Sequence, residues 1–171
     1  LYNVFAFIHS KDKGILFESD DKVLGMSNKM SFPRNPDNYL TTFKSAKTFV
    51  RVEKSHEQGI LNIDCNFKDR LKFKGSFLFS LESHQPLRVL NPNVPTRFTY
   101  TEKCSPLTTT DFELSLDGNP LEYEIDKVVA LYDWSGGYLG RETNWYWTAF
   151  GAILPDTTSI GANFAAFTNE T

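Results

Sequence analysis

The side chains best suited to chemistry gather in one stretch, Tyr132 to Gly151, which has the sequence YDWSGGYLGRETNWYWTAFG. Trp145 and Trp147 are two positions apart, so on a strand their rings share one face. Arg141 could lie over one ring as a cation–π contact worth roughly 0.5–2 kcal/mol, and Asp133 could hold Arg141 through an ion pair. This pattern predicts either a polar patch beside an aromatic cavity or an Asp–Arg–Trp lock that closes a barrel end, and the lock is the commoner arrangement.

Other chemical motifs are weak. Ser135 lacks a GxSxG elbow, and the glycines of residues 136–140 lack the Lys-Ser/Thr ending of a phosphate loop. Cys65 and Cys104 cannot define a disulfide scaffold, and neither CxxC nor HxH occurs. We therefore predict no metal site and no cofactor. Lys103 ends a predicted strand and is expected at the surface.

Composition restricts the partners. The 171 residues carry a formal net charge of −3, so no strong basic field favours nucleic acid. No apolar run approaches the roughly 20 residues of a membrane-spanning helix. The 15 phenylalanines, 7 tyrosines and 3 tryptophans suit either a phenylalanine-rich core or the walls of an apolar cavity.

Alternation of apolar and polar residues predicts an all-β fold. In Ile60 to Phe67, and again from Lys72 to Glu82, every second residue is apolar, which is typical of strands with one buried face. Prolines predict that Gln85 to Pro95 is a connector, and a return strand is predicted after the turn at Asp117–Pro120. Because about ten antiparallel strands rarely stay open, we predict a lipocalin-like barrel, or part of a tandem pair. Residues 1–95 would form a first meander and residues 96–171 a second.

A set of ordered motifs resembles one known family. They are Arg97–Lys103 (RFTYTEK), Leu121–Tyr123 (LEY), Asp133–Tyr138 (DWSGGY), Arg141–Trp147 (RETNWYW) and Ile160–Phe164 (IGANF). Their order is similar to that of the DUF2804 family, whose function is uncharacterised, and which is distantly similar to the hydroxyneurosporene synthase and AttH group. That resemblance implies paired lipocalin-like barrels and relatives that act on long apolar substrates. Family members are longer than this chain, so the resemblance also implies an internal fragment.

Two positions depart from the family pattern. Gly136 stands where the family usually has Arg, and Tyr146 stands where it prefers Asn between the two tryptophans. If that Arg took part in an activity, this chain lacks it, whereas Arg141 could still serve.

Three functions follow as hypotheses. The first is the binding of an apolar or lipid-like small molecule, with Arg141, Trp145, Trp147, Tyr100 and Asp133 as ligand contacts. The second is a structural or interaction subunit that contacts other proteins in a larger assembly. The third is a hydratase, isomerase or cyclase in which Asp133, with its pKa shifted by burial, would be the general acid or base. We expect binding rather than catalysis.

Overall fold

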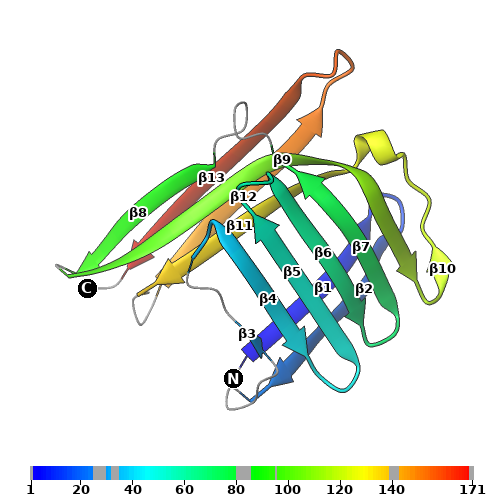
Figure 1. The fold of residues 1–171 in the computed structure, drawn as a ribbon, viewed down its shortest axis with the longest axis horizontal. Helices are drawn as coiled ribbons and strands as arrows, with labels where there is room; N and C mark the ends of the chain where they lie inside the picture. Colours follow the sequence, from blue (N-terminus) through cyan, green and yellow to red (C-terminus); the bar gives the residue numbers. More distant parts are fainter. Residues whose placement is uncertain are drawn as a thin grey trace. The chain divides into compact units, whose positions relative to one another are not determined.

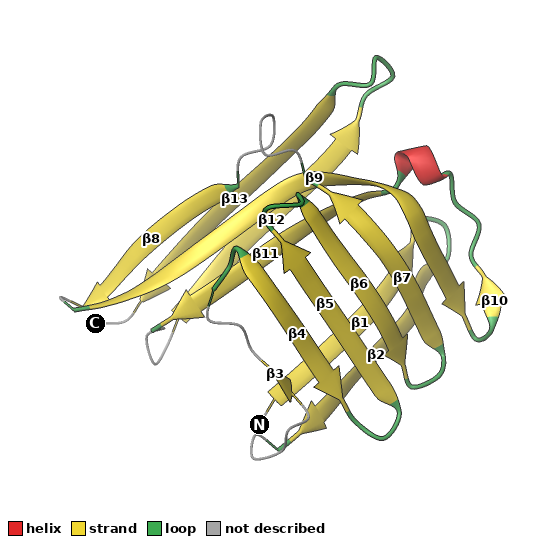
Figure 2. Cartoon of the chain, viewed as in Figure 1, coloured by secondary structure: helices red, strands yellow, loops and turns green. Residues whose placement is uncertain are grey.

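The computed structural model describes residues 2–24, 30–31, 35–79, 86–94, 96–138 and 143–169, and these residues form an all-β, antiparallel fold (Figures 1 and 2). This confirms the predicted fold class. No sheet closes on itself within these residues, so barrel closure stays a prediction. The elements are β1 (Tyr2–Ser10), β2 (Gly14–Val23), β3 (Met30–Ser31), β4 (Asn38–Lys44), β5 (Thr48–Ser55), β6 (Ile60–Phe67), β7 (Leu71–Leu78), β8 (Leu87–Val94), β9 (Arg97–Leu116), β10 (Asn119–Pro120), the 3-10 helix η1 (Ile125–Lys127), β11 (Val129–Gly137), β12 (Thr143–Ile153) and β13 (Ser159–Asn169).

The chain divides into two compact units. Unit 1 comprises residues 1–76 and 110–123, and unit 2 comprises residues 77–109 and 124–171, so the long strand β9 contributes to both. Unit 1 contains the β1–β2 hairpin and the strands from β3 to β7. In unit 2, β9 pairs with β8 and with β11, while β12 and β13 form a separate hairpin. The expected division into barrels at residues 95 and 96 stays a prediction.

The core of unit 1 follows the predicted alternation. Leu61, Cys65 and Phe67 on β6 are buried, as expected for every second residue of a strand with one covered face. Phe17, from the β1–β2 hairpin, joins this core with Leu71 at the start of β7. Burial of each such apolar side chain stabilises the unit by about 1.5–3 kcal/mol. The prediction that these side chains share an interior is confirmed.

In unit 2 a pair of glycines lets the β12–β13 hairpin lie against β9. Gly151 and Gly161 are cross-strand partners. A Cβ atom on Gly161 would lie 2.3 Å from the carbonyl oxygen of Ser105, and one on Gly151 would lie 2.8 Å from the Ser105 hydroxyl. Only glycine permits so close an approach of the two backbones.

Two predicted elements are wrong. Most of the predicted connector from Gln85 to Pro95 is strand β8, which pairs with β9. Its proline, Pro92, is tolerated because β8 is an edge strand among the described strands, where a missing N–H costs no ladder hydrogen bond. The predicted return strand does not form, because β10 covers only Asn119 and Pro120 within the predicted turn and residues 121–124 are irregular. The chain then enters η1, where Lys127 pairs with Glu124 at 2.6 Å.

Candidate functional site

Asp133, the predicted general acid or base, pairs with a lysine. It is the cross-strand neighbour of Lys103, and the Lys103 ammonium donates a hydrogen bond to its carboxylate. Lys103 is only 6% exposed, so the prediction that it lies at the surface is wrong. The sequence does not show this burial, because the strands that surround Lys103, β11 and the β12–β13 hairpin, come later in the chain. Arg141, the predicted partner, lies outside the described residues.

The same lysine also contacts the predicted aromatic wall. Its Nζ atom lies 4.6 Å from the centre of the Trp147 ring, a cation–π distance. The indole N–H of Trp147 in turn donates to the side-chain oxygen of Asn163 at 3.4 Å. We call Asp133, Lys103, Trp147 and Asn163 the lysine cluster. It joins strands β11, β9, β12 and β13 of unit 2. The side chain of Trp145 is not among those that the structure describes.

Tyr100 belongs to a second polar cluster, on the other face of the sheet. Its hydroxyl donates to the carboxylate of Glu102 at 3.2 Å, and Arg88 donates to the same carboxylate at 2.8 Å. Tyr132 donates to the second carboxylate oxygen. Glu102 is completely buried, so these donors compensate its charge. The structure therefore separates Tyr100 from Asp133, and both clusters cross-link β9 to its neighbours.

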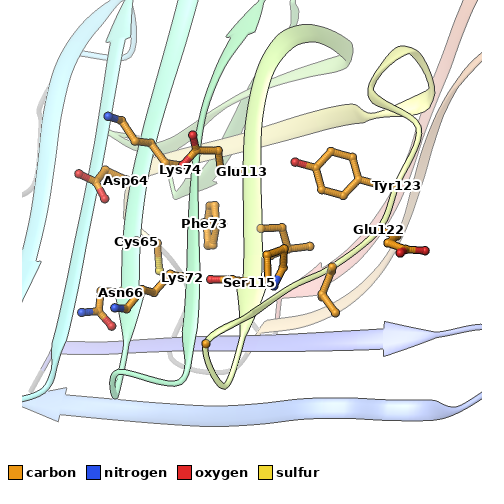
Figure 3. Close-up of a pocket in the computed structure, with 14 residues that line it drawn as sticks. Asp64, Cys65, Asn66, Lys72, Phe73, Lys74, Glu113, Ser115, Glu122 and Tyr123 are labelled. Atoms are coloured by element: carbon orange, nitrogen blue, oxygen red, sulfur yellow. The ribbon is translucent and has the colours of Figure 1, made fainter.

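The candidate ligand site lies in unit 1, where the prediction placed none. A pocket of about 800 Å³ opens beside β6, β7, the end of β9 and the stretch that follows β10 (Figure 3). Phe73 stands in the middle of this view. The apolar lining residues are Cys65, Phe73, Leu114, Leu121 and Tyr123. The charged lining residues are Asp64, Lys72, Lys74, Glu113 and Glu122.

Hydrogen bonds to β9 hold one wall of the pocket in place. The amide of Leu121 donates to the carbonyl of Leu114 at 2.9 Å. The Tyr123 hydroxyl donates to the carbonyl of Phe112, and the two rings lie 5.4 Å apart. The irregular stretch after β10 is thus fixed along β9, which keeps Leu121 and Tyr123 at the pocket.

A bidentate ion pair joins the two turns nearest the pocket. Arg70 donates to both carboxylate oxygens of Asp117 at 2.7 and 2.9 Å, and the Asp117 amide donates to the Arg70 carbonyl at 2.7 Å. The hydrogen bond from Arg70, with its positive charge, lowers the pKa of the Asp117 carboxyl below its ordinary value. Gly118 follows with φ +81° and lines the pocket. The pair therefore fixes the turn at this end of the site.

The pocket chemistry favours binding over nucleophilic attack. Burial raises the pKa of the Cys65 thiol to about 12, so the thiol stays neutral and poorly nucleophilic at physiological pH. Among the described residues, no three His, Cys, Asp or Glu side chains are placed to hold a metal ion. The described part of the chain also contains no helix that is both long and apolar enough to cross a membrane.

Comparison with protein families identifies the chain. Residues 1–171 match the family described as "Domain of unknown function (DUF2804)". The chain belongs to the DUF2804 family. Comparisons with curated proteins and with solved structures found no match.

The lysine cluster of this DUF2804 chain draws its four residues from four different segments of the ordered motifs. Lys103, Asp133, Trp147 and Asn163 lie in separate motif segments, and the structure brings them into one chain of contacts. Of the residues that line the unit 1 pocket, Leu121, Glu122 and Tyr123 form one motif segment and the others lie outside the motifs. Sequence reasoning missed the pocket because no motif marks a cavity between strands. The available signal was the alternation of residues 112–116, which places Leu114 toward the core.

Proposed function

We propose that this DUF2804 domain binds an apolar or amphipathic small molecule in the unit 1 pocket. One observation carries the proposal, namely a pocket of about 800 Å³ with Phe73, Leu114 and Leu121 in its lining. Small-molecule sites commonly have volumes of about 300–1,000 Å³ and mostly apolar walls with a few polar groups. The pocket has such a volume and lies entirely within one unit. Its lining is divided about equally between apolar and polar or charged residues, which suits an amphipathic ligand.

The charged lining residues suit the polar end of such a ligand. Lys72 and Lys74 are cationic donors of hydrogen bonds. The carboxylates of Asp64, Glu113 and Glu122 are acceptors, so the lining can bind either kind of polar group. An apolar body would displace water from Phe73 and its neighbours, which is favourable by about 25 cal/mol per Å² of buried apolar surface. Arg141, Trp145, Trp147, Tyr100 and Asp133 remain predicted ligand contacts in unit 2.

A pocket-filling variant tests the proposal. Ser115 lines the pocket and is half-buried, so Ser115→Phe would occupy part of the cavity. The matched control is Thr110→Phe, at an exposed position on the same strand. The fluorescent probe 1-anilinonaphthalene-8-sulfonate is titrated into each protein and displaced with decan-1-ol.

We expect Ser115→Phe to weaken decan-1-ol binding at least tenfold and Thr110→Phe to leave it within about twofold, since a 1.4 kcal/mol loss is one decade. Equal affinity in the wild type and Ser115→Phe would overturn the proposal. Circular dichroism of both variants checks that the β fold is retained.

A further inference from the structure

A second cavity adjoins the pocket within unit 1, and it opens to solvent beside the exposed side chains of Phe5 and Phe7. Its volume is about 310 Å³, and it is bordered by residues 4–8 of β1 on one side and by side chains of β5, β6 and β7 on the other. Val50, Phe67 and Leu71 are among the latter. Every residue that lines this inner chamber is apolar, whereas the outer pocket also has charged residues.

The inner chamber and the pocket share two lining residues. Cys65 and Phe73 line both cavities, so the cavities meet at these side chains. The Cys65 thiol is 3% exposed and packs in the core, while Phe73 is half-buried and packs against that core from the edge. Figure 3 shows the Phe73 ring among the other lining residues of the pocket. Phe73 is therefore the more exposed of the two shared residues, and its ring is the one that a ligand in the pocket would meet.

We propose that an unbranched apolar chain passes Phe73 into the inner chamber, while its polar head stays at the charged residues of the outer pocket. The ligand class is thus a single-chain amphiphile, and Phe73 limits the length and width of the chain. The reason is the difference in lining. The outer pocket offers charged side chains to a polar head, whereas the chamber offers only apolar contacts, and each methylene that enters it gains affinity. This inference rests on the proposed function and deepens it.

The test measures how affinity depends on chain length. The alkan-1-ols from hexan-1-ol to dodecan-1-ol, which share one neutral head, displace 1-anilinonaphthalene-8-sulfonate from the full chain. In the wild type, affinity should rise about fourfold per methylene, the value for transfer of one methylene out of water. Ala6→Leu and Val4→Phe each shrink the inner chamber, and neither position lines the outer pocket. Ala46→Leu, at an exposed turn, is the control.

We expect both variants to bind hexan-1-ol like the wild type but to lose the gain for longer chains, at least tenfold for dodecan-1-ol. Ala46→Leu should keep the full gain. If both variants retain the gain, or if the wild type has none while hexan-1-ol binds, the inference is overturned and the proposed function stands. If no alkanol binds the wild type, both fail. Should Ala6→Leu not fold, Val4→Phe decides.

Discussion

Removal of the Asp133 charge should destabilise unit 2 through Lys103. In Asp133→Asn the Lys103 ammonium stays where its side chain is only 7% exposed, and it keeps the Trp147 ring but loses its carboxylate. Loss of one partner of a fully buried pair costs about 3–5 kcal/mol. Because the Asp133 side chain is 29% exposed, solvent screens part of this pair, and we expect a loss of about 1–3 kcal/mol.

A double-mutant cycle separates this effect from general disruption. Lys103→Met keeps the length of the side chain, and Asp133 can then hydrate, so this change should cost about 1 kcal/mol. The double variant should recover much of the loss, with a coupling energy of about 1–2 kcal/mol. Urea unfolding followed by circular dichroism gives each free energy of unfolding. A coupling below about 0.3 kcal/mol, the usual error of additivity, would refute the account of the lysine cluster.

Three further changes test other parts of the structure. Gly161→Ala places a Cβ 2.3 Å from the Ser105 carbonyl oxygen. It should destabilise the chain by about 1–3 kcal/mol, which a lower Tm would show. An unchanged Tm would show that the β12–β13 hairpin does not lie on β9. Because Arg70 lowers the pKa of Asp117, the wild type should be more stable than Asp117→Asn at pH 7. This advantage should vanish as the pH falls below the ordinary carboxyl pKa of 3.8. Urea titrations at pH 7 and below that value check the prediction, and a pH-independent difference in stability would contradict it. Cys65, with a thiol pKa of about 12, should resist iodoacetamide at pH 8 in the folded protein and react in urea, and peptide mass spectrometry showing rapid labelling of the folded chain would contradict its burial.

Local patterns predicted the strands but not their partners. The alternation of Ile60 to Phe67 gave the bounds of β6, because a strand with one buried face leaves a period of two in its own residues. The prolines near β8 hid a strand, because sequence does not say whether a strand lies at an edge, where proline is tolerated. The connectivity of the sheets was likewise beyond reach, since pairing depends on residues far apart in the chain.

For the candidate sites, too, local patterns in the sequence predicted some residues but not their neighbours. Arg141 was predicted over a tryptophan ring, and it lies outside the described residues. The structure places Lys103 over the Trp147 ring, which was not predicted. The environment of Lys103 depends on β11 and β12, whose positions no local pattern reveals. The unit 1 pocket was not predicted at all, since a cavity is a gap between elements and leaves no pattern in the residues of any one of them.

Native mass spectrometry of the protein purified without denaturation tests the central claim most directly. The account predicts a small molecule of constant mass retained by the wild type and by Thr110→Phe and absent from Ser115→Phe, because that ring fills the pocket. Release of the molecule into organic solvent should yield an amphiphile. A molecule retained equally by Ser115→Phe, or a wild type that retains none and binds no decan-1-ol, would contradict it.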